Sequence, residues 1–398
     1  MKDRDLILNK IKPSRIEEIS LMFRVNRFLK RLNKNLWDAE AILGGSVAKG
    51  TFLKGQHDVD IFVLYKNDKD ISNKLESSLR IFKNIERVKG SRDYFQARVY
   101  GLNFEIVPVL KIKTVKEAKN ITDISPLHVD WVKKNAKGKI LDEIRLAKVF
   151  CKAQDVYGAE SYIKGFSGYV IEILTIYSGG FEKLIKNAVN WKYKQVIDIS
   201  KHYKKINKSK ESALLVIDPL DPGRNAAAAL SEDKFKRFKA ACKGYLNNPN
   251  NNFFERKDIT LKYLEDKDTV LRIKPLEGRK DIIGAKLLKT LELIKSKLED
   301  EGYNVAEANW HWGKTALLWF KVKNKELPPF KKHYGPPVIK KENVLGFKAR
   351  WEGYNINEED GKLYVNVPRE YKNLGEFILH VIKLEDVLAN VKEIRIMK

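Results

Sequence analysis

A glycine–serine turn stands a short distance before a strand pattern that carries two acidic residues. The turn is Gly44-Gly45-Ser46, and the strand pattern covers residues 58–65, where Asp58 and Asp60 alternate with apolar residues. Because residues i and i+2 of a strand point to the same face, the two carboxylates converge on one spot while the apolar residues enter the core. The pattern therefore predicts a strand buried on one side, with an acidic face next to a tight turn.

Two carboxylates on one face repel each other unless a cation lies between them, and Mg²⁺ is the natural candidate. A glycine–serine turn that opens a short helix supplies backbone N–H groups and a hydroxyl for an anion. Either feature alone is common in proteins, whereas the two together are far more specific. A phosphate site beside a pair of metal-binding carboxylates is typical of nucleotidyl transfer.

A third carboxylate, Glu105, follows in a predicted hairpin. Residues 94–100 alternate as a strand, 101–103 form a turn, and 104–108 return as a second strand with Glu105 between apolar neighbours. An unpaired carboxylate would be costly to bury there, and a metal ion shared with the two aspartates removes that cost. The alternative is that Glu105 pairs with a nearby Lys or Arg.

Further motifs run nearly from end to end of the chain, at 125–131, 143–148, 157–160, 165–169, 218–219, 224–225, 334–338 and 360–365. With the turn, the acidic strand and the segment 104–108, they make the chain resemble the archaeal-type (class I) CCA-adding enzymes. These are the tRNA nucleotidyltransferases of the polymerase-β-like nucleotidyltransferase superfamily. The first motif belongs to the whole superfamily, whereas the middle ones are specific to this branch.

The resemblance implies a multidomain α+β protein with a polymerase-β-like nucleotidyltransferase palm, a helical central domain and ferredoxin-like or RNA-recognition-like modules at the C-terminus. The hydrophobic patterns predict the same order. Strands and helices alternate as far as Gly138, helical periodicity follows, and a β-α-β-β order comes after an Asn-rich linker at 247–252. We therefore expect a palm over 1–138, a central nucleotide-binding domain over 139–255 and a tRNA-binding body and tail over 256–398.

The charge of the chain indicates the kind of partner. Lys and Arg number 77 against 52 Asp and Glu, and the net charge of +25 predicts a polyanion, with nucleic acid the obvious choice. No apolar run approaches the ~18 residues that a bilayer span needs, so we expect no membrane role. The N-terminus lacks the apolar core of a signal peptide. Cys151 and Cys242 lie far apart, which argues against a disulfide framework or a zinc site and fits the cytoplasm.

For catalysis, the resemblance assigns Asp58, Asp60 and Glu105 to two Mg²⁺ ions as ligands. Glu105 would bind the ion that activates the attacking 3′-hydroxyl. The chain departs from the family here, because an Asp is more usual at the position of Glu105. The extra methylene should displace that carboxylate slightly.

The resemblance also assigns a set of residues to ATP and CTP. Ser46 and Lys49 match triphosphate contacts, and Lys49 stands where many relatives carry Arg. Arg224 precedes a helix predicted to start near Asn225, and it would lie near the incoming base, where its planar fork can read the edges of C and A. The nucleotide-binding set is Gly45, Ser46, Lys49, His128, Lys148, Tyr157 and Arg224.

The implied function is template-independent addition of C, C and A to the 3′ end of tRNA from CTP and ATP, with release of pyrophosphate. A poly(A) polymerase or an oligoadenylate synthetase has the same palm motif and is the alternative enzyme. An inactive RNA-binding protein would keep only the basic surface, and the three carboxylates argue against it. Relatives also suggest a homodimer. Trp310-His311-Trp312 has two interpretations, a stacking surface for RNA or the core of a hairpin, and the alternation favours the core.

Overall fold

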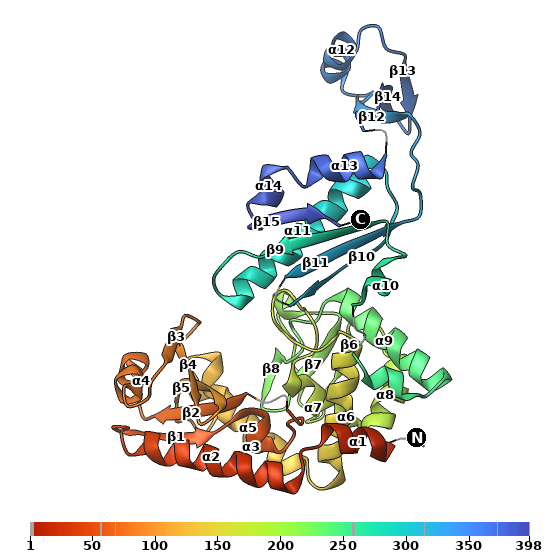
Figure 1. Ribbon diagram of the computed structural model, residues 1–398. Coiled ribbons are helices and arrows are strands. Elements are labelled where there is room, and N and C mark those ends of the chain that lie inside the picture. The colour runs from red at the N-terminus through yellow and green to blue at the C-terminus, as the bar shows by residue number, and fades with distance from the viewer. Residues whose placement is uncertain are drawn as a thin grey trace. The chain divides into compact units, whose positions relative to one another are not determined.

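The computed structural model describes residues 4–55, 58–67, 69–256, 259–313, 315–371 and 373–397. It divides into two compact units, Met1–Lys257 and Asp258–Lys398. Figure 1 draws the first unit in red to green and the second in green-cyan to blue. Across the described ranges, every helix is too short or too polar to cross a membrane.

The N-terminal part of the first unit contains a five-stranded sheet (Figure 1). Its strands follow the order β1-β2-β5-β4-β3; β2 and β5 are parallel, and the other neighbours are antiparallel. This sheet with its helices is the palm that the sequence predicted. The elements are α2 (Arg15–Asn33), β1 (Ala39–Leu43), α3 (Gly45–Lys49), β2 (Val59–Tyr65), α4 (Ile71–Leu79), β3 (Ile85–Val88), β4 (Tyr94–Val99) and β5 (Leu102–Leu110).

Strand β2 is buried along most of its length. Val59, Ile61 and Val63 pack in one core with the apolar faces of α2 and α4, which confirms the predicted alternation. On the opposite face, Phe62 packs with Val107 of β5 in a second, smaller core. The face of β2 that carries Asp60 is therefore acidic only near the carboxylates. Farther along the strand, the same face is covered by apolar residues.

The rest of the first unit is mainly helical, with a small sheet of order β6-β7-β8. Its large core joins apolar residues of most of these helices, among them Phe150, Phe181 and Phe238, with Phe166 of the segment before α7. The elements are α1 (Arg4–Ile11), α5 (Ser125–Asn135), α6 (Lys139–Ala153), α7 (Gly168–Ser178), α8 (Phe181–Val189), β6 (Gln195–Ile197), β7 (Leu214–Asp218), β8 (Asp221–Asn225) and α9 (Glu232–Asn247), with 3₁₀ turns at 115–117, 121–124, 208–210 and 251–254.

The prediction of a helix from about Asn225 is wrong. Residues Asp221–Asn225 form β8, which pairs with β7, and α9 begins only at Glu232. The Oδ1 atom of Asn225 accepts hydrogen bonds from the backbone N–H groups of Val216 and Ala227, both at 3.0 Å. These bonds hold the segment against β7, so the chain cannot turn into a helix there.

The second unit contains a four-stranded antiparallel sheet of order β10-β11-β9-β15, which packs on α11, α13 and α14. Trp310 and Trp312 pack against this core, as the alternation favoured. A smaller sheet, β12-β14-β13, packs with α12. The elements are α10 (Leu261–Leu264), β9 (Thr269–Lys274), α11 (Lys280–Glu301), β10 (Val305–Trp312), β11 (Ala316–Val322), β12 (Phe330–Pro337), α12 (Lys341–Arg350), β13 (Ile356–Glu359), β14 (Lys362–Pro368), α13 (Leu374–Val381), α14 (Glu385–Leu388) and β15 (Glu393–Ile396).

Candidate active site

Asp60 and Glu105 lie opposite each other on the two parallel strands of the first sheet. They are Cα partners in the register of β2 and β5, so their side chains point to the same face. Asp58 comes immediately before β2 and is exposed, whereas the other two carboxylates are partly buried. The structure thus brings the three predicted metal ligands to one patch of the sheet.

Burial and the neighbouring aspartates oppose ionisation of Asp60 and Glu105. Burial raises the pKa of Asp60 to about 6; the charge of Lys49 opposes this shift and that of Asp58 adds to it. Burial is also the main cause that raises the pKa of Glu105 to about 7, and the charges of Asp60 and Asp58 add to it. A divalent cation at this patch would relieve the repulsion and restore the ionised forms.

The patch offers oxygen donors, which suit Mg²⁺. Gly45 shapes it, because a Cβ built on this residue would overlap with Oδ2 of Asp60, and its φ of +56° is rare for other residues. The carboxylate of Asp60 therefore lies directly against the backbone of the glycine–serine turn. Within the described ranges, no three acidic, His or Cys side chains are already grouped tightly enough to hold one ion among them. The donor chemistry fits the metal, and Asp58, Asp60 and Glu105 are the residues that would hold it.

Asp58 and Glu105 also line an open cavity of about 410 Å³, together with Glu86, Gln96 and Arg98. The predominantly polar lining suits a charged ligand. This cavity gives solvent and ligands access to the carboxylate patch.

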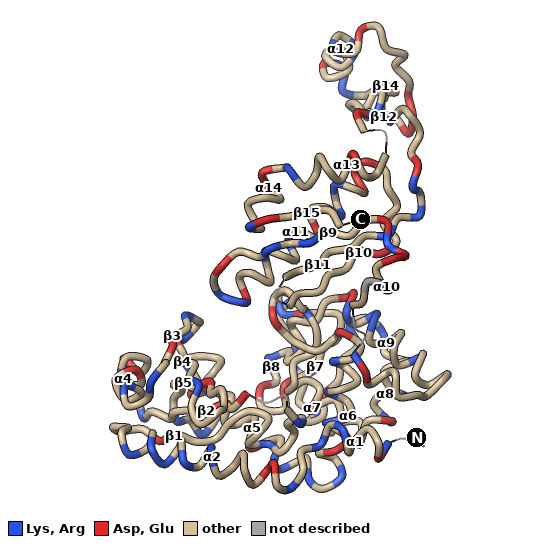
Figure 2. The backbone as a smooth tube through the Cα atoms, in the orientation of Figure 1, with Lys and Arg blue, Asp and Glu red and all other residues tan. Residues whose placement is uncertain are grey.

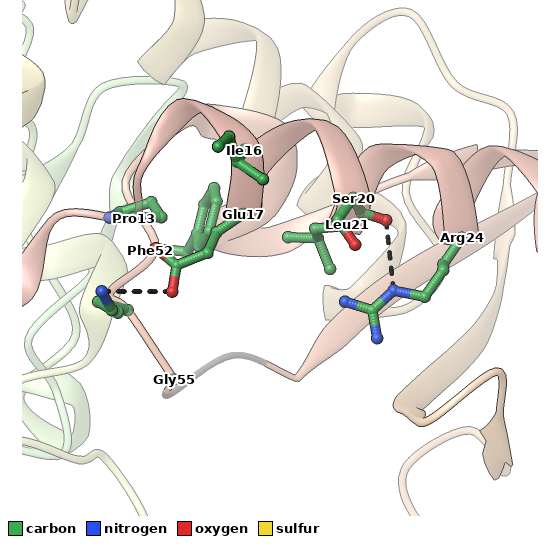
Figure 3. A pocket seen from close by; sticks show the side chains of 9 residues that line it. Pro13, Ile16, Glu17, Ser20, Leu21, Arg24, Phe52 and Gly55 are labelled. Carbon is green, nitrogen blue, oxygen red and sulfur yellow. Dashed lines mark hydrogen bonds and ion pairs between the residues drawn. The ribbon is translucent and has the colours of Figure 1, made fainter.

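A second cavity, of about 330 Å³, lies between the first turns of α2 and the segment that follows α3 (Figure 3). Pro13, Ile16, Leu21 and Phe52 give it a largely apolar wall. Its lining includes none of the residues that the sequence assigned to the metal or the nucleotide, so we do not consider it the active site.

Glu172 lies inside α7, and its side chain is only 1% exposed. Its Oε2 atom accepts a hydrogen bond from Nζ of Lys49 at 2.8 Å, and its Oε1 atom accepts one from Nζ of Lys148 at 2.7 Å. Oγ1 of Thr51 also donates to Oε1, at 2.6 Å, and accepts from Nζ of Lys148 at 2.9 Å. The two lysines of the predicted nucleotide-binding set therefore meet at one buried carboxylate.

The two ammonium groups keep Glu172 ionised. Burial opposes the ionisation, but the charges and hydrogen bonds of Lys148 and Lys49 outweigh it and lower the pKa of Glu172 to about 2. Both lysines also act to lower the pKa of Asp60, so their charges reach the carboxylate patch. The sequence assigned no role to Glu172, although one signal was available: it is the only charged residue in the apolar sequence of α7.

Asp218 ends β7 and gathers two more predicted residues. Nε2 of His128 lies 3.1 Å from its Oδ2 atom, which also accepts a hydrogen bond from Nη1 of Arg224. The backbone N–H of Leu220 donates to Oδ1 at 3.0 Å. Burial opposes ionisation of the Asp218 carboxyl, but the hydrogen bond from His128 and the charge of Arg224 hold its pKa below the ordinary value. Sequence reasoning noted Asp218 as part of a motif and gave it no role.

Tyr169 contacts both the residues around Glu172 and the residues around Asp218. Its ring stacks on that of His128 with 4.1 Å between the centroids, and Nζ of Lys49 lies 5.4 Å from the same ring. The hydroxyl of Tyr157 lies beside Gly168, where a Cβ would come within 2.9 Å of it. The predicted residues therefore all lie in the first unit, around three acidic centres: Asp60 and its neighbours, Glu172, and Asp218.

Family models match three consecutive parts of the chain. A "nucleotidyltransferase domain" matches residues 24–151, a "tRNA nucleotidyltransferase, second domain" matches 142–255, and a "CCA-adding enzyme, C-terminal domain" matches 271–394. Together they cover most of both units.

Three similar proteins carry the name CCA-adding enzyme. That of Nanoarchaeum equitans is 38% identical over 349 residues, which span 83% of this chain and 84% of that protein. That of Sulfurisphaera tokodaii is 32% identical, with 92% and 88% covered, and that of Methanothermobacter thermautotrophicus is 29% identical, with 98% and 90% covered.

Two solved structures share the fold at low sequence identity. An RNA terminal uridylyl transferase, Cid1, has a TM-score of 0.53 at 12% identity, and covers 65% of this chain and 98% of its own. A cytoplasmic RNA terminal U-transferase has a TM-score of 0.51 at 15% identity, with 65% and 98% covered. These likenesses support the polymerase-β-like fold.

Proposed function

Since the chain belongs to the CCA-adding enzyme family, it is a tRNA nucleotidyltransferase, and we propose that it completes the 3′ end of tRNA with two bound Mg²⁺ ions. C, C and A are added one at a time from CTP and ATP, and each addition releases pyrophosphate. The observation that carries the proposal is the patch of Asp58, Asp60 and Glu105 next to the two lysines on Glu172.

Asp58, Asp60 and Glu105 would hold the metal ions. Bound there, divalent ions lower the pKa of the attacking 3′-hydroxyl and neutralise charge on the triphosphate and the departing pyrophosphate. The protein keeps two of the carboxylates partly buried, with raised pKa values of about 6 and about 7 in the absence of metal. Metal binding therefore displaces protons at neutral pH, and the affinity for the ions should rise with pH.

Ser46, Lys49 and Lys148 would bind the triphosphate. Gly45 brings the backbone of the turn against Asp60, and Ser46 follows Gly45 directly in α3. Ser46 is therefore close to Asp60, one of the proposed metal ligands. The charges of both lysines reach Asp60. Positioning of the triphosphate against the ions supplies much of the catalytic effect in reactions of this class, because the attacking and leaving oxygens must be in line.

His128 and Arg224 would contact the incoming base, with Tyr157 near the sugar. Arg224 remains 26% exposed while Asp218 holds its Nη1 atom, so its planar fork is fixed in direction and still reachable from solvent. The choice between C and A at each step would follow from the shape of this pocket and from the tRNA end that enters it.

The partner is tRNA. Figure 2 shows Lys and Arg along both units, with Asp and Glu interspersed, and the excess of positive charge suits a long phosphate backbone. We assign the palm to 1–138, the central domain to 139–255 and the tRNA-binding body and tail to 256–398. A cytoplasmic location suits the two buried free cysteines, and the family resemblance implies a homodimer.

The test uses tRNA without its CCA end, Mg²⁺, and CTP alone, ATP alone or both, with the products sequenced. We expect two C residues from CTP alone and a finished CCA from both nucleotides. Asp60→Ala should add nothing, whereas Asp233→Ala, which removes an exposed carboxylate at the start of α9, should act like the wild type. A long A tail from ATP alone would favour a poly(A) polymerase instead, and salt-sensitive tRNA binding without extension would identify an inactive binder.

A further inference from the structure

Glu172 takes no direct part in the reaction as proposed, yet its burial requires an explanation. Its neighbours along α7 are apolar, and its side chain is 1% exposed. Replacement of a buried ion pair by apolar residues is often neutral or stabilising. An apolar residue at this position would suit the helix and the core, so stability alone does not account for the carboxylate.

The balance of charge around Glu172 points to an anionic ligand. One carboxylate faces the two ammonium groups of Lys49 and Lys148, so the cluster keeps a surplus of one positive charge. Without the carboxylate, the two buried ammonium groups would repel each other, and burial would favour loss of a proton from one of them. With it, the charge and hydrogen bond of Glu172 counter the burial that lowers the pKa of Lys148, and a positive surplus is left for phosphate.

Lys49 and Lys148 differ in the number of hydrogen bonds that they make. Nζ of Lys148 donates to Glu172 at 2.7 Å, to Oγ1 of Thr51 at 2.9 Å and to the carbonyl oxygen of Thr51 at 3.4 Å, which engages its three donors. Nζ of Lys49 donates to Glu172 at 2.8 Å and lies over the ring of Tyr169. An ammonium group has three donors. Lys148 is therefore anchored, and Lys49 is the lysine better placed to turn donors toward a phosphate.

We propose that Glu172 is the positioning residue of the triphosphate site: it anchors Lys148 as a fixed positive charge and directs Lys49 toward the phosphates, without touching the nucleotide or the metal. It joins α3 of the palm to α6 and α7 of the central part through one carboxylate. The inference rests on the proposed function in one respect, namely that the two lysines bind the triphosphate. It predicts that Glu172 affects the phosphate end of any nucleotide and not the choice of base.

The first experiment measures binding of CTP, ATP and inorganic tripolyphosphate by calorimetry, with Mg²⁺ and without tRNA. Glu172→Gln keeps the shape of the side chain and removes its charge. We expect the dissociation constants of all three ligands to rise about tenfold or more and by the same factor, so that the ratio for CTP and ATP stays that of the wild type. Wild-type affinity, or a loss for one nucleotide only, would overturn the proposal.

A second comparison separates positioning from folding. The variant K49M/K148M is compared with K49M/K148M/E172Q, which contains none of the three charged groups of the cluster. If Glu172 acts through the lysines, adding E172Q changes the affinity by less than about twofold. A further large loss would show that Glu172 acts by another route and would contradict the inference. If Glu172→Gln alone does not fold, Glu172→Asp replaces it, because the shorter side chain keeps the charge and cannot reach both lysines; wild-type affinity would then overturn the proposal.

Glu143→Gln is the matched control. Glu143 of α6 is also largely buried, accepts a hydrogen bond from the backbone N–H of Phe181 at 2.9 Å and pairs with Arg4. Its loss should lower the melting temperature and leave CTP affinity unchanged. The proposed function can fail separately: a wild type whose CTP affinity depends on Glu172 but which does not extend tRNA would refute CCA addition and leave this inference standing.

Discussion

Asp60 of β2 and Glu105 of β5 are direct partners across two parallel strands, and the strand register alone brings their side chains to the same face. At the position of Glu105, the family resemblance implies an Asp. Because the backbone fixes the direction of the side chain, the extra methylene lengthens its reach without turning it to another face. The longer side chain of Glu105 therefore leaves the proposed metal-binding patch in place.

Glu105→Gln should reduce tRNA extension by about 100-fold or more, because it removes the charge of a proposed metal ligand and leaves the strand intact. Glu105→Asp keeps the carboxylate, is the residue that the family resemblance implies, and should keep activity within about tenfold of the wild type. Single-turnover rates with saturating CTP measure both. Glu86→Gln, on β3 and in the lining of the same cavity, is the control and should act like the wild type. Full activity of Glu105→Gln would remove this residue from the metal site.

The stability of the metal-free protein should depend on pH through Glu105. Its pKa rises from 4.5 to about 7 on folding, so between these values the folded state binds more protons than the unfolded state. Stability contributed by this group is therefore lost as the pH rises through this window, by about 1–3 kcal/mol. Melting temperatures in EDTA should fall with pH more steeply for the wild type than for Glu105→Gln. Added Mg²⁺ should abolish that difference, and parallel curves in EDTA would contradict the expectation.

Gly45→Ala should abolish activity, because the added Cβ would overlap with the carboxylate of Asp60. It should also lower the free energy of unfolding by more than the ~1 kcal/mol that a positive φ costs Ala. Gly138→Ala is a close control, since Gly138 has the same φ of +56° and no atom within 4 Å of the added Cβ. Chemical denaturation and CTP incorporation compare the two. Equal effects of both variants would mean that backbone strain, and not contact with Asp60, explains the glycine.

Asp218→Asn should change the choice of base and leave the phosphate site intact. It removes the charge that holds His128 and Arg224, while the size of the buried side chain stays the same. We expect the KM ratio for CTP and ATP to shift by about tenfold, with tripolyphosphate inhibition unchanged. Glu211→Gln, which breaks only an exposed pair with Lys194, should leave the ratio as it is. An equal loss for all three ligands would indicate that Asp218 supports the whole pocket.

Local sequence patterns determine much of this fold. The alternation at Val59, Ile61 and Val63 reports which side of β2 is buried, since the period of a strand is a property of the backbone. The same reasoning predicts that Trp310 and Trp312 belong to a core. It fails at Asp221–Asn225, because the side chain of Asn225 bonds to backbone groups of β7, and no local pattern encodes that pairing.

The candidate site, too, follows partly from the sequence and partly from the tertiary structure. The sequence determined the family and, through motifs, the residues that would contact the metal and the nucleotide. Only the tertiary structure showed that Glu172 and Asp218 hold those residues, since each carboxylate meets partners that lie between 6 and 123 positions away in the chain. Burial decides which carboxylate must find a cation, and burial is a property of the packed molecule. For that reason the sequence shows that Glu172 is a lone charge in an apolar helix, but it does not show that Glu172 contacts Lys49 and Lys148.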